Sequence, residues 1–336
     1  MKKKNIWLCG IMGLVVGDAF GLPVQFQTRE EMQKNPVRKM TGNGTFNMPA
    51  GSWSDDSSLT LATLESIYRL QRIDCVDIME NFADWLVDGK FTPFGYAYDQ
   101  GATCTKAIMN YIVSGDVETC GVQGEWANGN GALMRILPVC LFAYEKVENG
   151  EWTDADAIEQ VHKVSALTHN HLRSQIACGI YYFFVKELLN GRGTSVTERL
   201  QAGIDKAREF YQKDEESRTQ LAYYLRMFDM NAFGYMPMKE IKSSGYVVDT
   251  LEAVVWCLLV EMSYCEVAFM AISLGGDTDT IAAIACGLAA LCYGYDWIPK
   301  DWLEVLQRRD ELEEQCLNVA NMMAKKENVA TSAQFQ

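Results

Sequence analysis

Residues 274–280 read Leu-Gly-Gly-Asp-Thr-Asp-Thr, and an apolar run from Ile281 to Tyr293 follows them directly. That run is too short to cross a bilayer and has the length of a buried core helix. The two carboxylates and two hydroxyls therefore lie at the mouth of a helix whose body is in the core. Asp277 and Asp279 would point to different sides of a regular helix. They converge only if the preceding glycines keep the backbone turning.

Helix capping explains only part of this polar group. One Asp or Thr at a helix start commonly accepts a hydrogen bond from a free N–H of the first turn. Capping uses one or two of the four oxygen-bearing side chains and leaves the others without a role. An oxygen-only group of this kind suits a hard cation such as Mg²⁺ or Mn²⁺.

The rest of the chain favours helices. It has 336 residues, 49% of them apolar, which is enough to bury a large core. Helical spacing recurs throughout, including at Gln220–Asp229 and Trp302–Ala324, and no convincing run of alternating strand residues is present. We expect an all-α fold, with one domain over residues 1–325 and a polar tail at 326–336.

Charge and cysteine content limit the partners and the compartment. A net charge of −14 argues against a nucleic-acid or anionic-membrane partner. Eleven cysteines scattered through apolar runs, without a C-x-x-C pair, predict reduced buried thiols and a cytoplasmic protein. Lys2–Lys4 and the apolar stretch Ile6–Val16 are similar to a signal peptide, but no clean small-x-small cleavage site follows. We expect a first core helix there.

A second polar group lies at the start of another predicted helix, where residues 52–58 read Ser-Trp-Ser-Asp-Asp-Ser-Ser. It is equally compatible with a capped helix whose acids lie near the positive end. Adjacent carboxylates stay ionised more readily beside a cation. If both polar groups face one cleft, they supply enough oxygens for two cations, which together can hold an attacking water and a substrate oxygen.

Three weaker signals accompany these groups. Gly129-Asn130-Gly131 leads into a helix and suits a phosphate, although Asn-Gly pairs usually make turns. Arg135 behind it fits a structural ion pair as well as a phosphate contact. Thr168-His169-Asn170-His171 lacks a third zinc ligand nearby, so a loop contact or structural histidine is favoured. Asp99 alone has the character of a turn residue.

These pieces carry a resemblance to the ADP-ribosylglycohydrolase family, which includes the dinitrogenase-reductase-activating glycohydrolases and the mammalian ADP-ribosyl hydrolases. The similar pieces run in family order from about residue 10 to residue 295 and cover nearly the whole chain. They are Gly17-Asp18-Ala19-Phe20-Gly21, Ser54-Asp55-Asp56, Asp99-Gln100-Gly101, Gly129-Asn130-Gly131, Thr168-His169, Gly245-Tyr246 and the motif at 275–280.

The resemblance implies a single-domain orthogonal helical bundle with two divalent cations, Mg²⁺ or Mn²⁺, at the base of an ADP-ribose cleft. The metal ligands it implies are Ser54, Asp55, Asp56, Asp277, Asp279 and Thr280. It also implies catalytic roles for Asp56, Asp279 and Asp99, of which Asp99 contacts the reacting ribose. The ADP-ribose contacts it implies are Asn130 and Gly131 at the pyrophosphate, His169, and Tyr246 against the adenine.

Two departures from the family pattern bear on the chemistry. Ser54 and Ser57 replace the more usual threonines, and the hydroxyls remain. Gln25 stands where many relatives have a glutamate, and a glutamine cannot accept a proton as a base. If that glutamate serves as an acid or base in some relatives, this chain must use Asp99 or a metal-bound water instead.

The expected function is hydrolysis of the ribosyl bond of an ADP-ribosylated protein or small molecule, with release of ADP-ribose. The alternative is a catalytically weak or inactive ADP-ribose-binding protein, or a structural protein like the crystallin relatives of the family. A prenyl-diphosphate synthase is disfavoured, because residues 55–59 lack the later acid of an aspartate-rich motif. The acceptor linkage stays open at this point.

Overall fold

The computed structural model describes residues 5–191 and 193–333, so Lys2–Lys4 of the signal-like N-terminus lie outside it. No strand occurs among the described residues, and the all-α prediction is confirmed. The α-helices are α1 (Ile6–Gly21), α2 (Arg29–Lys34), α3 (Asp55–Leu70), α4 (Cys75–Asp88), α5 (Ala102–Ser114), α6 (Leu137–Glu148), α7 (Asp154–Ala166), α8 (Leu172–Asn190), α9 (Val196–Tyr211), α10 (Glu215–Leu221), α11 (Met230–Gly234), α12 (Val247–Val260), α13 (Tyr264–Ser273), α14 (Thr278–Tyr293), α15 (Lys300–Val305) and α16 (Arg309–Ala333).

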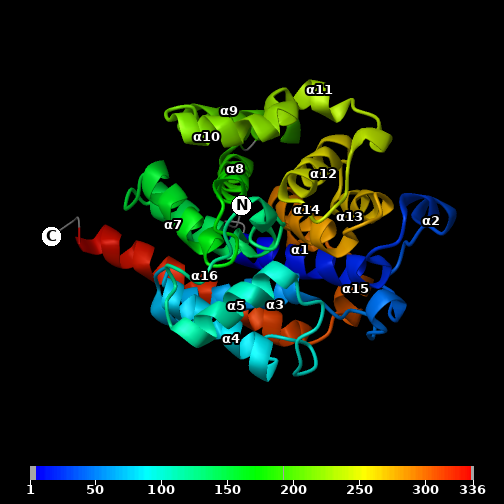
Figure 1. The fold of residues 1–336 in the computed structure, drawn as a ribbon, viewed down its shortest axis with the longest axis horizontal. Coiled ribbons are helices and arrows are strands. Elements are labelled where there is room, and N and C mark those ends of the chain that lie inside the picture. The colour runs from blue at the N-terminus through cyan, green and yellow to red at the C-terminus, as the bar shows by residue number, and fades with distance from the viewer. Residues whose placement is uncertain (1–4, 192, 334–336) are drawn as a thin grey trace.

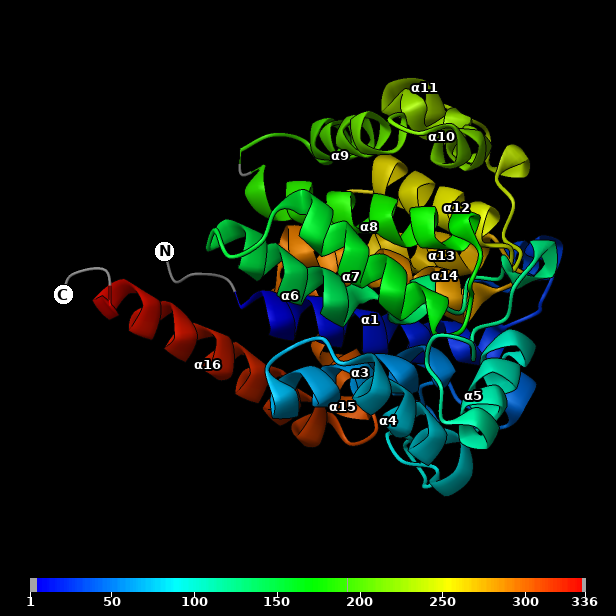
Figure 2. The same ribbon diagram turned by 60° about the vertical axis from the view of Figure 1, so that its left-hand side comes forward.

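Helices α1 and α14 form the centre of the bundle, and the other helices surround them in layers (Figure 1). Helices α3, α4 and α5 lie on one side of this pair, with α15 and α16 beside them. Helices α8 and α12 lie on the other side and are covered by α9, α10 and α11 (Figure 2). The site predicted from the two polar groups is thus built at helix ends around the central pair.

Glycines allow α1 and α14 to approach closely. A Cβ atom on Gly13 would lie 2.7 Å from the carbonyl oxygen of Cys286, and one on Gly17 would lie 2.7 Å from Cys286 Cβ. At the end of α1, a Cβ on Gly21 would lie 2.7 Å from the backbone nitrogen of Asp279. The two backbones are therefore in near contact, and the end of α1 meets the start of α14 that carries the Asp-Thr-Asp-Thr motif.

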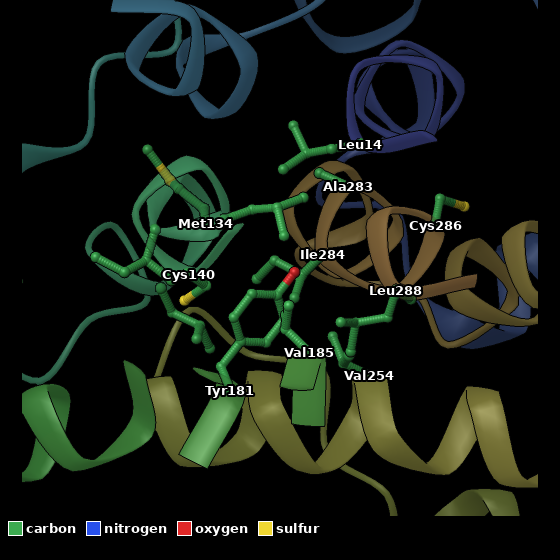
Figure 3. Packing of buried hydrophobic residues seen from close by; sticks show 14 of the residues in the cluster. Leu14, Met134, Cys140, Tyr181, Val185, Val254, Ala283, Ile284, Cys286 and Leu288 are labelled. Atoms are coloured by element: carbon green, nitrogen blue, oxygen red, sulfur yellow. The ribbon is translucent and has the colours of Figure 1, made fainter. Parts of the chain in front are cut away.

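The core continues from this pair toward α8 and α12. Figure 3 shows Leu14 of α1 and Leu288 of α14 in one apolar cluster with Tyr181 of α8, Val254 of α12 and Met134. All five side chains are buried. Burial of such side chains supplies the main driving force for folding. It therefore fixes the helix ends that carry the polar groups.

The helix predicted at Gln220–Asp229 is wrong in its bounds and type. Helix α10 begins earlier because Asp214 accepts a hydrogen bond from the N–H of Ser217 and so caps its first turn. The backbone then tightens into a 3₁₀-helix over Ala222–Phe228.

The single C-terminal helix predicted at Trp302–Ala324 is also wrong, because the chain breaks into α15 and α16. The N–H of Gln307 donates to the carbonyl of Gly51, and Arg308 takes a left-handed φ of 48°. The N–H of Gln307 is therefore used in a tertiary hydrogen bond, and not in the hydrogen bond that a continued helix would require. Helix α16 then runs to Ala333, so helical backbone extends into the predicted polar tail.

Length and composition alone would let residues Ile6–Val24 cross a membrane, since their mean hydropathy is 1.7. In the folded protein, 89% of that segment is buried. Its glycine face packs against α14, as expected for the core helix predicted from the sequence.

We predict that Gly17→Ala lowers the free energy of unfolding by about 2–3 kcal/mol, the usual cost of overpacking a tight core. The new methyl group would clash with the carbonyl of Ala282. Gly234→Ala is the matched control, because its Cβ would lie 3.4 Å from Leu259 Cβ, an ordinary contact. Urea unfolding followed by circular dichroism measures both. Equal stability of the two variants would contradict the close approach of α1 and α14.

A second prediction concerns His162, whose Nε2 lies 2.7 Å from the hydroxyl of Tyr211. Burial lowers the pKa of His162 to about 4, whereas an unfolded histidine has a pKa of about 6.5. The unfolded state therefore binds more protons between these values, and stability falls as pH falls through this window. From pH 7 to pH 5 we expect this histidine to cost about 2 kcal/mol.

The measurement is urea unfolding of the wild type and His162→Phe at pH 7 and pH 5. The phenyl ring keeps the stacking on Tyr211, which has an interplanar angle of 6° for the histidine. We expect the variant to lose less stability between the two pH values than the wild type. Equal losses would show that this histidine does not resist protonation.

Candidate active site

Asp18 of α1 organises the start of α3. Its two carboxylate oxygens each lie 3.0 Å from the backbone nitrogen of Ser54, and Oδ2 also accepts from the N–H of Ser57 at 3.0 Å. The Ser57 hydroxyl donates to the same oxygen at 2.6 Å. Burial raises the pKa of Asp18 to about 6, although these hydrogen bonds lower it. Asp18 thus ties the second polar group to the central helix pair.

Asp18 had no predicted role. The signal that identifies it is a lone carboxylate inside an otherwise uncharged apolar helix, where a charged group needs a strong partner. The partner is the positive N-terminal end of α3.

The starts of α3 and α14 meet, as the sequence predicted. The Thr280 hydroxyl lies 3.4 Å from Asp56 Oδ2 and 3.3 Å from Asp277 Oδ1, so it bridges the two polar groups. Ser54 caps α3, and its hydroxyl lies 3.0 Å from Asp56 Oδ2. Residues more than 200 positions apart in the chain therefore share one buried site.

Two loops complete the surroundings. The N–H of Gly101 lies 3.4 Å from Asp55 Oδ2 and brings the Asp99 loop over the start of α3. Asn130 donates its side-chain amide to Asp277 Oδ2 at 2.6 Å and to the Thr250 hydroxyl at 3.0 Å. Its backbone N–H donates to the carbonyl of Gly245, so it is not available to a phosphate. Asn130 acts on a carboxylate of the site.

A cavity of about 390 Å³ opens above these residues. Its wall includes Asp55, Asp99, Asp277 and Thr280, together with Asn130 and His169. Asp56, Asp279 and Ser54 are buried close beneath, with exposures of 1% or less. The arrangement is a cavity with a base of carboxylates and hydroxyls, large enough for part of a nucleotide-sized ligand.

The carboxylates at this base are electrostatically uncompensated. Burial raises the pKa of Asp55, Asp56 and Asp279 well above the usual range, and the neighbouring carboxylates raise it further. Burial is also the main cause that raises the pKa of Asp99. Asp56 Oδ1 and both carboxylate oxygens of Asp279 have no hydrogen-bond partner. Buried acceptors without donors are rare and costly.

These unpartnered oxygens fit hard divalent cations, which bind carboxylate and hydroxyl oxygens. Among the described residues, no three Asp, Glu, His or Cys side chains stand as a ready-made cage for an ion. The hydroxyls of Ser54 and Thr280 would therefore have to complete the carboxylate set. This is the donor set named from the sequence.

The other residues that were predicted to contact ADP-ribose are His169, Gly131 and Tyr246, and they differ in their surroundings. His169 is 2% exposed, and burial together with Arg135 lowers its pKa to about 3, so it is neutral. A Cβ on Gly131 would lie 2.9 Å from the His169 ring, which explains this glycine. The hydroxyl of Tyr246 accepts a hydrogen bond from Arg173 at 3.2 Å. Tyr246 does not line the cavity, although the preceding residue, Gly245, is part of its wall.

Two open alternatives are settled by the contacts. Arg135 is fully buried, and its guanidinium donates to the Thr168 hydroxyl at 2.7 Å and to the Val164 carbonyl at 3.2 Å. These contacts give it a structural role, through hydrogen bonds to neutral groups and not through the suggested ion pair. His171 caps α8 by accepting from the N–H of Arg173 at 3.1 Å. In the His-x-His pair, His169 therefore lines the cavity and His171 caps a helix. This agrees with the expectation of a loop contact or a structural histidine in place of a zinc ligand.

Comparison with known proteins identifies the family of this chain. The family model described as ADP-ribosylglycohydrolase matches residues 8–329. The chain belongs to the ADP-ribosylglycohydrolase family. Its reaction class is therefore hydrolysis of an ADP-ribose linkage, as predicted.

Several relatives of this glycohydrolase are similar over most of their length. An ADP-ribosyl-dinitrogen reductase glycohydrolase of Rhodospirillum rubrum is 33% identical over 91% of this chain and 92% of its own. The ADP-ribosylarginine hydrolase Tri1 of Serratia proteamaculans is 30% identical over 90% and 75%. A solved chain titled ADP-ribosylglycohydrolase-related protein complex superposes with a TM-score of 0.75 at 28% identity, covering 96% of this chain and 100% of that one.

We predict that Asp279→Asn makes the glycohydrolase more stable when divalent cations are removed. The substitution takes a charge out of a site where both carboxylate oxygens lack partners. The melting temperature in EDTA should rise by roughly 2–6 °C, as expected for relief of buried charge. Asp205→Asn, on the exposed face of α9, is the matched control and should shift the melting temperature little. A lower melting temperature for Asp279→Asn would mean that its carboxylate has a stabilising partner.

Proposed function

We propose that this glycohydrolase uses two divalent cations, Mg²⁺ or Mn²⁺, to hydrolyse the bond between ADP-ribose and its acceptor. The observation that carries the proposal is the set of buried, unpartnered carboxylate oxygens on Asp56 and Asp279. The residues that would hold the ions are Ser54, Asp55, Asp56, Asp277, Asp279 and Thr280. When bound, the ions supply positive charge that orients ribose hydroxyls and lowers the pKa of a water.

The chain's own residues position the substrate in this proposal. Asn130 holds Asp277 through the 2.6 Å hydrogen bond, so one ligand carboxylate keeps a fixed orientation. Gly131 and the neutral ring of His169 give the pyrophosphate side of the cavity a close, uncharged wall. The adenine contact in this proposal is Tyr246, whose hydroxyl accepts a hydrogen bond from Arg173.

The proposal gives proton transfer to Asp99. It lines the cavity, and its Oδ2 has no hydrogen-bond partner. Its pKa is raised by burial, which brings the carboxyl closer to the range in which it can both accept and donate a proton. Gln25 beside it cannot take that role. We therefore assign general acid–base work at the ribose to Asp99.

The acceptor on which the proposal is first tested is arginine, because one relative is named ADP-ribosylarginine hydrolase. Most of the cysteines are buried, which fits a reducing compartment, and we place the reaction in the cytoplasm. An ADP-ribosylated protein or small molecule is the proposed partner.

The competing function is an ADP-ribose-binding protein without turnover. Its supporting feature is Gln25, which replaces a titratable residue at the cavity. The complete oxygen set at the cavity base favours the enzyme. Calorimetry with ADP-ribose, with and without Mg²⁺, followed by a turnover assay separates the two, because a binding protein takes up ADP-ribose and releases none from any linkage.

We predict that EDTA abolishes ADP-ribose release and that added Mg²⁺ or Mn²⁺ restores it. Asp56→Asn should lower kcat on the order of 100-fold or more, because a required ligand oxygen is lost. Asp205→Asn should keep wild-type activity. Release of ADP-ribose is measured by chromatography on substrates that differ only in linkage. Full turnover in EDTA would overturn the two-cation proposal.

A further inference from the structure

Arg135 is a buried cation whose hydrogen bonds, in the part of the chain that the structure describes, go to neutral oxygens. Its Nη2 donates to the hydroxyl of Thr168 and to the carbonyl of Val164. Its Nε and Nη1 are buried without a hydrogen-bond partner. The guanidinium carbon lies 4.7 Å from the ring centre of Phe82. A buried charge is costly unless it is paired, so this arginine calls for a role besides packing.

The hydroxyl of Thr168 connects Arg135 to His169. It accepts the N–H of Arg135 at 2.7 Å, and it lies 2.9 Å from Nδ1 of His169. A threonine hydroxyl donates one proton and accepts with two lone pairs, whereas a guanidinium only donates. The hydroxyl proton is therefore free to point to Nδ1. In that arrangement Nδ1 is an acceptor, and the proton of the neutral ring is on Nε2.

The opposite tautomer fits these contacts less well. If Nδ1 carried the ring proton, the Thr168 hydroxyl would accept two hydrogen bonds and could not donate its own proton to His169. The remaining acceptor would be the sulfur of Cys104, which Thr168 also contacts, and sulfur is a weak acceptor. A buried donor without a good acceptor costs free energy. The positive charge of Arg135 also opposes a second N–H that points toward it.

Val122 fixes the backbone on both sides of His169. Its N–H donates to the carbonyl of Thr168 at 3.0 Å, and its carbonyl accepts from the N–H of Asn170 at 2.9 Å. The N–H of His169 itself donates to the carbonyl of Ser165 at 3.0 Å. Backbone hydrogen bonds therefore hold this loop in place. The Thr168 hydroxyl is left to act on the imidazole ring.

The Nε2 edge of His169 faces the two glycines of the loop at residues 129–131. A Cβ atom on Gly129 would lie 3.2 Å from Nε2, and one on Gly131 would lie 3.4 Å from it. Gly129, Gly131 and His169 all line the cavity. Because neither glycine has a side chain, neither one separates Nε2 from a ligand in the cavity.

We propose that Arg135 and Thr168 are positioning residues that hold His169 in the Nε2–H tautomer, with this N–H directed to a pyrophosphate oxygen of ADP-ribose. Arg135 donates to the hydroxyl, the hydroxyl donates to Nδ1, and Nε2–H donates to the ligand. The buried cation thus assists an anionic ligand through a neutral donor. The inference rests on the proposed function, which puts the pyrophosphate beside His169, and it adds the residues that orient this contact.

The first test observes the tautomer directly. The chain has three histidines, so isotope-labelled histidine gives a simple side-chain NMR spectrum, in which His162→Phe and His171→Asn assign the other two rings. In the Mg²⁺-loaded wild type, the proton of His169 should be on Nε2, and ADP-ribose should shift the Nε2 signal. Thr168→Val should lower the share of this tautomer. Thr168→Ser, which keeps the hydroxyl, should retain it.

The second test measures the contact with the ligand. By calorimetry in Mg²⁺, Thr168→Val should weaken ADP-ribose binding by about 3- to 30-fold, as expected when a hydrogen bond to a charged group is impaired. In turnover assays KM should rise while kcat changes little, the pattern for loss of a contact made equally before and in the transition state. Thr168→Ser should restore the affinity.

Thr63→Val is the matched control for both tests. Thr63 is also fully buried, and its hydroxyl donates to the carbonyl of Leu59 in its own helix at 2.8 Å. This variant should keep the His169 spectrum and the affinity for ADP-ribose. If Thr168→Val does not fold, the wild-type tautomer and its response to ADP-ribose decide the question.

Three results would overturn the inference. They are a wild-type His169 with its proton on Nδ1, an unchanged ADP-ribose affinity in Thr168→Val, and an equal loss of affinity in Thr168→Ser, which would assign the effect to packing. Absence of ADP-ribose binding by the wild type also overturns it, because the assigned ligand is then lost. Full turnover in EDTA would overturn the two-cation proposal alone, since the tautomer and the affinity are measured without turnover.

Discussion

The near contact between α1 and α14 is the constraint from which the site follows. It exists because Gly13 and Gly17 leave no side chain between the two backbones. At one end of this contact, Gly21 meets the start of α14, and the Thr278 hydroxyl donates to the Gly21 carbonyl at 2.9 Å. Asp18, one turn from that end, reaches α3. One helix therefore sets the positions of both polar groups.

The site buries several carboxylates, which costs free energy, and the stable apolar core around it tolerates this cost. Several carboxylates are buried side by side, and their pKa values are raised by burial and by one another. Such an arrangement destabilises the free protein and is typical of functional sites. The apolar packing around α1 and α14 stabilises the fold and so offsets the cost of burying these charges. Divalent ions are the chemistry that the unpartnered oxygens of Asp56 and Asp279 fit.

The two sides of the cavity differ in chemical character. Backbone and a neutral histidine form one wall, while Phe26 and Gln25 form part of the other. Strained φ values occur at Phe26 and Asp99, which belong to the same wall. Left-handed φ values also occur at Gln71, Phe91 and Arg308, outside this wall, so they do not by themselves mark a ligand surface.

The sequence by itself determined the all-α class, the polar residues at two helix starts and the family. Hydrophobic spacing is local, so the all-α class was predicted from it, and short motifs identified the oxygens from Ser54 to Thr280. Tertiary structure alone decided the role of Asp18, the break at Arg308 and the amide contact of Asn130 with Asp277. Each of these depends on a partner far away in the chain. Local propensity carries no information about such partners, because they are brought together only when the core packs.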